Sequence, residues 1–148
     1  MQPFPLASLP VKLGIRAGSK VSVINPPSGF LQRLNPLPDG VEFLITSRSG
    51  LDVILFFTDD EKELVKRLPA LSRAMAVNGG IWVCWPTRAE VKSILSEEFI
   101  RQTALEIGLI DNKRCNLDES WSGLRLIWKP RPRVEKPRAR KSSPAAQA

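Results

Sequence analysis

Short apolar runs alternate with amphipathic segments along most of the chain. Four runs rich in β-branched and aromatic residues predict strands at 20–25, 41–46, 52–57 and 81–85. The third run has no polar alternation, which is typical of a strand buried on both faces of a sheet. Two later segments, 111–117 and 124–128, alternate between apolar and polar residues and are close enough for a hairpin. The pattern therefore predicts a sheet that ends in two antiparallel strands.

A helix is predicted after the third strand. Thr58-Asp59-Asp60-Glu61 has the spacing of a capping box, and its acids would lie at the positive end of the helix dipole. The apolar residues that follow form one stripe at helical spacing: Leu64, Val65, Leu68, Leu71 and Met75. Pro69 predicts a kink or a break near Leu68, because proline removes a helical N–H and clashes with the preceding turn. Asn78-Gly79-Gly80 predicts the end of this element.

Two further helical segments complete the pattern. Residues 96–107 predict a helix that ends at Gly108, and residues 29–35 have room for two helical turns before Pro36. Strands that alternate with helices predict a layered α/β domain. With right-handed crossovers, the first, third and fourth strands would be parallel neighbours. Few residues separate the second strand from the third, so either the chain passes directly under the sheet or the second strand pairs antiparallel.

Charge is concentrated at one end of the chain. The 148 residues carry a formal net charge of +7, and residues 129–148, with seven basic residues and one acid, contribute +6 of it. The remaining residues are nearly neutral, which gives no support for a basic groove on the folded part. Prolines and like charges predict that residues 129–148 form a disordered basic tail. This tail is interpreted as a solubilising terminus in preference to a weak nucleic-acid arm, because it has no aromatic residue for base stacking.

Composition excludes several chemistries. The chain has no histidine, which excludes Ser-His and Cys-His nucleophiles, His-ligated metals and an imidazole base. Two cysteines, Cys84 and Cys115, are too few for a zinc site and are interpreted as reduced thiols on strands, one of them largely buried. The first ten residues contain three prolines and no basic residue, unlike a signal peptide, and no run approaches about 18 apolar residues. We therefore predict a cytoplasmic protein with no membrane partner and no bound metal.

Several local sequences resemble those of known proteins. The buried strand at 52–57, its helix, Gly79-Gly80 before the next strand and the closing hairpin look like the second half of a class I S-adenosylmethionine-dependent methyltransferase. A closer resemblance, over residues 11–128, is to a bacterial family of unknown function. The segments that carry it are 13–15, 25–30, 36–38, 68–71, 85–86, 108–113 and 121–125. The resemblance implies a three-layer Rossmann-like domain at 11–128, with a mostly parallel sheet, after an irregular segment at 1–10.

Departures from the methyltransferase pattern indicate that no cofactor is bound. Those enzymes place a Gly-rich turn after the first strand, so that backbone amides can approach the cofactor. Here the turn is Asn25-Pro26-Pro27-Ser28-Gly29, in which two prolines remove two N–H donors. Thr46-Ser47 stands where an acid usually binds the ribose hydroxyls, and the short link that follows leaves out a strand and a helix. The resemblance therefore implies the fold without a complete site for S-adenosylmethionine.

Candidate binding residues follow the predicted parallel strands. Ligands of doubly wound sheets bind beyond the carboxyl ends of the strands. The residues that we predict at this rim are Asn25, Pro27, Ser28, Gly29, Phe30, Thr58, Asp59, Trp85, Pro86, Asp118, Trp121 and Ser122. The last three join the others if the strand at 111–117 is also parallel. Because the turn containing Trp121 is short, its indole must either pack or bind something.

Each candidate also has a purely structural interpretation. Asn-Pro-Pro resembles a substrate-amine clamp of some amino-methyltransferases, but there it follows the fourth strand, and a rigid turn is the favoured interpretation here. Trp85-Pro86 follows a strand where such a motif could lie, although a packed indole and a strand terminator are favoured. Asp59, Asp60 and Glu61 suit helix capping better than a metal. An acid/base cluster of Asp111, Lys113, Asp118 and Glu119 competes with ordinary solvated hairpin residues, which we favour.

The function predicted from these observations is a non-catalytic or regulatory binding module that keeps a site for a small molecule or a protein at the rim. A divergent S-adenosylmethionine-dependent methyltransferase is the alternative. Weak nucleic-acid association through the tail is a second alternative.

Overall fold

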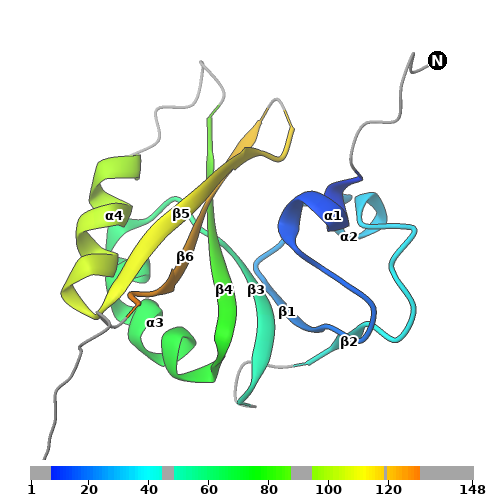
Figure 1. Cartoon of the computed structure of the whole chain (residues 1–148). Helices are drawn as coiled ribbons and strands as arrows, with labels where there is room; N and C mark the ends of the chain where they lie inside the picture. Colours follow the sequence, from blue (N-terminus) through cyan, green and yellow to red (C-terminus); the bar gives the residue numbers. More distant parts are fainter. Residues whose placement is uncertain (1–7, 45–48, 88–94, 119, 131–148) are drawn as a thin grey trace, which may run out of the picture.

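The computed structural model describes residues 8–44, 49–87, 95–118 and 120–130 (Figure 1). Within these residues a six-stranded sheet has the order β2-β1-β3-β4-β6-β5. The strands are β1 (Lys20–Ile24), β2 (Glu42–Phe43), β3 (Leu51–Phe57), β4 (Met75–Pro86), β5 (Leu109–Asn116) and β6 (Trp121–Trp128). The helices are α1 (Leu9–Leu13), α2 (Phe30–Arg33), α3 (Glu61–Ala74) and α4 (Glu97–Glu106).

The strand directions confirm the predicted parallel core and the closing hairpin. β1 is parallel to β3, and β3 is parallel to β4. β6 pairs antiparallel with both β4 and β5, so β5 runs in the same direction as β4. β2 pairs parallel with β1, which makes the antiparallel alternative for the second strand wrong. β2 has only two residues, and its Phe43 aligns with Val21 of β1, as does Val53 of β3. The end of β2 and the start of β3 therefore lie at the same level of the sheet, and a short connection can join them.

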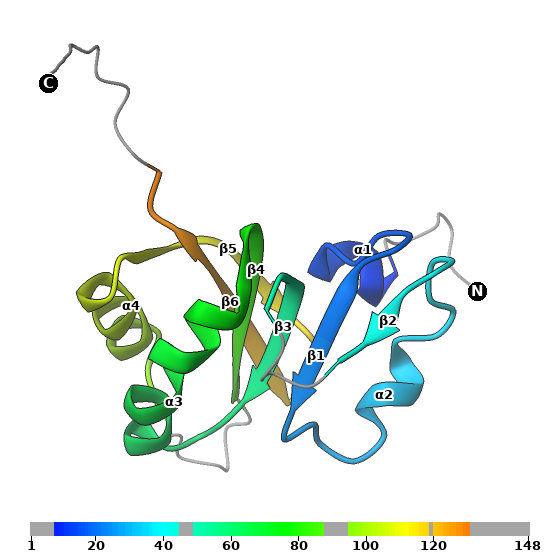
Figure 2. The same ribbon diagram turned by 90° about the horizontal axis from the view of Figure 1, so that it is seen from below.

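Helices cover both faces of the sheet and give the predicted three layers (Figure 2). On one face, α3 and α4 contribute Leu64, Leu68 and Ile100 to a core with the strand residues Phe56 and Val83. On the other face, α1 and α2 pack a second core against the sheet. Its members include Leu13, Phe30, Leu34, Leu55, Phe57 and Trp82. Because β3 contributes side chains to both cores, its continuous apolar run is explained by burial on both faces.

Gly79 and Gly80 lie inside β4 and do not end the preceding element. β4 begins directly after α3, at Met75, so the predicted turn at Asn78-Gly79-Gly80 is wrong. A Cβ atom on Gly79 would come within 2.7 Å of the carbonyl oxygen of Leu51, and one on Gly80 would come within 2.5 Å of the Arg125 side chain. Gly79 is therefore needed for close approach of the backbone of β3, whereas Gly80 leaves room for the Arg125 side chain.

α3 also departs from its predicted form. It runs from Glu61 to Ala74 as one helix, so the predicted break at Pro69 is wrong, whereas the predicted kink stays a prediction. Val65, four residues before Pro69, is 50% exposed, and water can therefore reach the carbonyl that proline leaves without a donor. The N-cap is Asp60, whose carboxylate accepts a hydrogen bond from the amide of Lys62 at 3.0 Å. The capping box predicted with Thr58 as the cap is therefore wrong by two residues.

A short N-terminal helix was missed at the sequence level. α1 begins at Leu9, before the predicted domain boundary at residue 11, and Leu13 is fully buried in the second core. The indole nitrogen of Trp82 donates a hydrogen bond to the carbonyl oxygen of Leu13 at 3.0 Å. Five residues make too few turns for a periodic signal, and for that reason the pattern did not indicate this helix. In the part of the chain described, no helix is long and apolar enough to cross a bilayer.

The two cysteines are free, as predicted. Cys84 is buried in β4 and Cys115 is partly buried in β5, with Gly123 of β6 aligned between them. Two strand spacings of about 4.8 Å each separate their Cα atoms by more than the ~7 Å that a disulfide can span. Burial, with a smaller contribution from Cys115, raises the pKa of the Cys84 thiol well above its usual value of 9.0.

This burial predicts a dependence of stability on alkaline pH. Above about pH 9 the Cys84 thiol ionises in the unfolded chain but not in the native protein. The contribution of the buried thiol to the free energy of unfolding is therefore complete below this pH and is lost as pH rises. We expect wild type to be more stable than Cys84→Ala at pH 7, and the difference to shrink by up to about 1.4 kcal/mol per pH unit above pH 9. Urea unfolding between pH 7 and 10.5 measures the difference, and a constant difference would contradict this account.

Candidate binding rim

The carboxyl ends of β1, β3, β4 and β5 lie at one edge of the sheet. β5 runs parallel to β4, which brings the turn between β5 and β6 to the same edge as the segments that follow the other three strands. We call this edge the rim. The amide of Thr87 donates to the carbonyl oxygen of Ser120 at 2.7 Å, and this bond ties the end of β4 to the β5–β6 turn.

The turn after β1 is held by the side chain of Asn25. Its backbone is left-handed, with φ at 57°, a conformation that asparagine tolerates better than most residues. The amide nitrogen Nδ2 donates to the carbonyl oxygen of Phe57 at 3.4 Å and to Oε2 of Glu63 at 3.2 Å. Ser28 is exposed, and Gly29, with φ at 81°, is the N-cap of α2. Asn25 therefore links the ends of β1 and β3 to the first turn of α3.

Glu63 is the acid at the centre of this region, and the sequence reasoning did not identify it. The hydroxyl of Thr58 donates to Oε1 of Glu63 at 2.6 Å, and the same hydroxyl accepts from the amide of Asp60 at 3.2 Å. Thr58 is buried, whereas Asp59 is exposed. Both carboxylate oxygens of Glu63 thus accept hydrogen bonds from residues at strand ends. The sequence signal for this role was that Glu63 lies in the first turn of a predicted helix, close to the end of the strand before it.

Three aromatic rings join the segments of the rim. Phe30, at the start of α2, packs edge-on against Phe57 with ring centroids 4.7 Å apart. Phe57, at the end of β3, packs edge-on against Trp121 at 5.3 Å. Trp121 is half-buried at the start of β6. Its indole therefore packs against the core as well as facing solvent.

Asp118 fixes the turn between β5 and β6. Its Oδ1 accepts from the amides of Ser120 at 2.7 Å and Trp121 at 2.9 Å, and its Oδ2 forms an ion pair with Arg33 at 2.7 Å. Arg33 also donates to the carbonyl oxygen of Leu117 at 2.6 Å, which ties α2 to this turn. Ser122 is buried, and its hydroxyl donates to Oδ1 of Asn116 at 3.0 Å, within the hairpin.

Trp85 and Trp121 lie on opposite faces of the sheet. Trp85 belongs to the core on the α3 and α4 face, where the Arg114 guanidinium lies 5.9 Å from the centroid of its ring. Trp121 packs against the core on the other face, and Pro86 is its neighbour across β4 and β6. A shared site lined by both indoles is therefore not formed. The pairing of β4 with β6 decides which face each indole occupies, because adjacent residues of a strand point to opposite sides of the sheet.

The acid/base cluster, the interpretation that the sequence did not favour, is not assembled either. Asp111 pairs with Arg101 of α4 at 3.2 Å, and Asp118 lies at the other end of β5 with Arg33. Lys113 belongs to the middle of β5, while Glu119, like Thr46 and Ser47, lies outside the described residues. Among residues 8–44, 49–87, 95–118 and 120–130, no three acidic or cysteine side chains are grouped closely enough to hold a metal ion.

A concavity at the carboxyl ends of β1 and β2 was missed at the sequence level. It has a volume of about 470 Å³, and we call it the rim groove. Its lining is mostly apolar and consists of Val23, Pro26, Leu31, Asn35, Leu37, Phe43 and Leu44. Leu31 and Phe43 are each 48% exposed. Exposed apolar residues on both sides of the Pro36-Leu37-Pro38 segment were the signal for it.

The packing of Trp121 predicts a moderate loss of stability on truncation. Trp121→Ala removes one edge-on aromatic contact and part of a half-buried ring, and we expect a loss of about 1 to 3 kcal/mol. Trp82→Ala, which empties a fully buried site and removes the hydrogen bond to Leu13, should cost about 3 to 5 kcal/mol. Urea unfolding of both variants measures the difference. Equal losses would show that Trp121 is as much a core residue as Trp82.

The chain is similar in fold to several solved structures, methyltransferases among them. The chain is similar to the N-methyltransferase NodS from Bradyrhizobium japonicum WM9, with a TM-score of 0.58 and 13% identity over 82% of this chain and 92% of that one. It is also similar to DhpI in complex with SAH, with a TM-score of 0.57 and 14% identity over 82% and 81% of the two chains. A TehB-like SAM-dependent methyltransferase from Corynebacterium glutamicum gives a TM-score of 0.54 and 12% identity over 76% and 82%. The fold is therefore Rossmann-like and methyltransferase-like, as predicted.

Sequence comparison identifies the family. No curated protein matches the chain. Residues 46–130, more than half of the chain, match the family described as "Protein of unknown function (DUF3052)". This match covers β3 to β6, the same part of the chain that includes Glu63, Trp85 and Trp121. The chain therefore belongs to the DUF3052 family of proteins of unknown function.

Proposed function

We propose that this protein is a non-catalytic binding module on a methyltransferase-like fold, and that it receives a small molecule with an apolar body at the rim. One observation carries the proposal: the polar side chains at the ends of β1 and β3 are hydrogen-bonded to one another. Glu63 accepts from Thr58 at 2.6 Å and from Asn25 at 3.2 Å. Thr58 is buried, Glu63 is partly buried and Asn25 is exposed, and their hydrogen bonds to one another occupy the polar groups that a substrate would otherwise meet.

The backbone of the turn after β1 supports the same conclusion. Pro26 and Pro27 have no N–H to offer to a cofactor, and the side chain of Asn25 is engaged with Phe57 and Glu63. The aromatic contacts Phe30–Phe57 and Phe57–Trp121 fill the space between α2, the end of β3 and the hairpin. Polar cofactor groups in this space would lose hydrogen bonds to water without gaining equivalent partners.

The rim groove offers accessible space with an apolar lining at this edge. Its volume of about 470 Å³ is within the usual range for small-molecule sites, ~300 to 1,000 Å³. Apolar side chains dominate its lining, and Asn35 supplies a side-chain amide. Such a lining favours an apolar or aromatic group with one polar substituent over a multiply charged cofactor.

A matched pair of leucines tests the groove. Leu31 lines it and is 48% exposed, and Leu105, on α4 over the other face, is 47% exposed. We expect Nile red, a neutral apolar dye, to bind wild type and Leu105→Gln with equal affinity and Leu31→Gln at least tenfold more weakly. Fluorescence titration gives the three affinities. Equal affinities for the two variants would show that the dye does not use the groove, and native mass spectrometry of the purified protein would show any ligand that co-purifies.

The alternative is a divergent S-adenosylmethionine-dependent methyltransferase, which the likeness to solved methyltransferases favours. We expect no binding of S-adenosylmethionine or S-adenosylhomocysteine at micromolar concentrations. Each unpaired polar group would cost about 1 to 3 kcal/mol, and about 1.4 kcal/mol is a factor of ten in affinity. Isothermal titration calorimetry tests this expectation. Micromolar binding that Asn25→Ala or Gly29→Val abolishes, in variants that melt cooperatively, would replace the binding module with the methyltransferase.

A further inference from the structure

A basic cavity lies at the edge of the sheet opposite the rim. It has a volume of about 520 Å³ and is formed by the amino ends of the parallel strands, the end of α1 and the middle of the β5–β6 hairpin. Its charged lining residues are Lys12, Arg16, Lys113, Arg125 and Asp52. The near-neutral total charge of the folded part gave no support for a basic groove, because a total says nothing about how charges of each sign are distributed.

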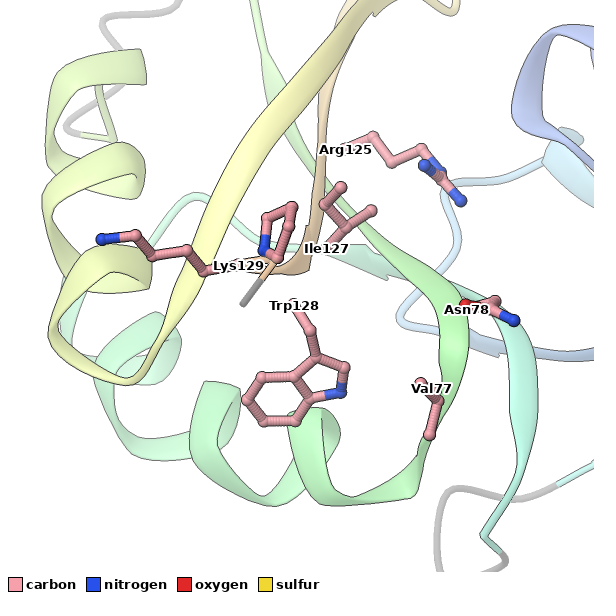
Figure 3. A pocket seen from close by; sticks show the side chains of 8 residues that line it. Val77, Asn78, Arg125, Ile127, Trp128 and Lys129 are labelled. Atoms are coloured by element: carbon pink, nitrogen blue, oxygen red, sulfur yellow. The ribbon is translucent and has the colours of Figure 1, made fainter. Parts of the chain in front are cut away.

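Arg125 is the central cation of this cavity. It extends from β6 past β4, on the side where Asn78 lies (Figure 3). A Cβ atom on Gly80 would come within 2.5 Å of its Nε and 2.7 Å of its Cζ, so the guanidinium group lies against the bare backbone of Gly80. One guanidinium nitrogen donates to Oδ1 of Asn112 at 3.3 Å. Asn112 stands at the register shift between Asp111 and Lys113, a bulge that interrupts regular pairing with β6.

The four cations of the cavity outnumber Asp52, the acid in its lining. Among the described residues, the ion pairs of arginine involve Arg33, Arg67, Arg101 and Arg114, and none involves Arg125. The partner directly across from Arg125 in β5 is Lys113, and like charges in such a pair are destabilising. Asp52, the acid in the lining, accepts from the amide of Lys20 at 2.8 Å. Burial and the charge of Arg16 lower the pKa of Arg125.

A second cavity adjoins the first. It has a volume of about 660 Å³ and shares Asn78 and Arg125 with the basic cavity. Its other lining is largely apolar and includes Val77, Ile127, Trp128 and Pro130 (Figure 3). A molecule with an anionic group beside Arg125 could therefore place an apolar or aromatic part against this surface.

We propose that the basic cavity binds a small molecule that carries phosphate groups, with its apolar part in the adjoining cavity. The fold brings four cations from separate segments around one concavity, and an anion there would remove their mutual repulsion. Phosphate fits better than carboxylate because its oxygens point in several directions and it carries more charge, whereas a carboxylate presents two oxygens in one plane. A small molecule fits better than nucleic acid, because the cations surround a single cavity and do not follow a line of backbone phosphates.

Exposed residues of the cavity allow a test that leaves the fold intact. We would titrate the full-length protein with pyrophosphate and with ADP by isothermal titration calorimetry at about 150 mM salt. Lys113→Gln and Arg16→Gln each remove one exposed cation of the cavity, and Lys66→Gln removes one exposed cation from α3 on the other face. We expect at least tenfold weaker pyrophosphate binding in the first two variants and wild-type affinity in Lys66→Gln. ADP should bind more tightly than pyrophosphate.

Gly80→Ala separates geometry from charge. The added methyl group would displace the guanidinium of Arg125 while leaving the net charge unchanged. We expect loss of pyrophosphate binding in this variant, with cooperative thermal unfolding retained. Wild-type binding in Gly80→Ala would show that Arg125 is not the anchor.

Several results would overturn the proposal. Absence of pyrophosphate and ADP binding would do so, as would equal affinities in Lys113→Gln and Lys66→Gln. Citrate that binds as tightly as pyrophosphate would exclude selectivity for phosphate, and ADP no tighter than pyrophosphate would exclude the adjoining cavity. Binding of a short DNA or RNA duplex in place of pyrophosphate would assign the charge to nucleic acid. None of these results bears on the rim, which is tested with a neutral dye.

Discussion

The position of β4 is the constraint on which the rest of the structure depends. β4 pairs parallel with β3 on one side and antiparallel with β6 on the other, so both of its edges are hydrogen-bonded. Residues 81–85 of β4 are all buried, because helices or chain segments cover both faces. A strand enclosed in this way can carry few polar side chains. Polar and charged side chains are therefore found at the two ends of the strands, where the rim and the basic cavity lie.

The likeness to methyltransferases and the polar contacts at the rim bear on different questions. TM-scores of 0.54 and 0.58 with solved methyltransferases, at 12 and 13% identity, establish a common arrangement of strands and helices and nothing more. Chemistry depends on which side chains are available at the strand ends. Here Glu63, Thr58 and Asn25 bond to one another, and Asp118 bonds to Arg33 and to its own turn. These bonds hold the loops together, and the rim groove offers accessible apolar surface beside them.

The sequence predicted an element correctly where the signal lies within a few neighbouring residues. It failed where the register between strands decides which residues meet. Strands such as β3 and the helix at 97–106 were predictable, because apolar composition and the Ser96 cap act within a few residues. The Gly79-Gly80 pair was misread as a turn, since its role depends on Leu51 and Arg125, which are distant in the chain. Trp85 and Trp121 were placed together, and only the pairing of β4 with β6 shows that they face opposite sides. The cluster around Arg125 was hidden because charges summed along a sequence cancel even when they are separated in space.

The hydrogen bond from Trp82 to α1 has a consequence for the population of molecules in which the basic cavity is complete. α1 is five residues long and could not persist by itself, so its place on the sheet depends on burial of Pro10 and Leu13 and on the indole hydrogen bond. α1 and the loop after it supply Lys12 and Arg16 to the cavity. Local opening of α1 would remove one wall of the cavity while the sheet stays folded. The apparent affinity for any anion is then the intrinsic affinity multiplied by the fraction of molecules in which α1 is docked.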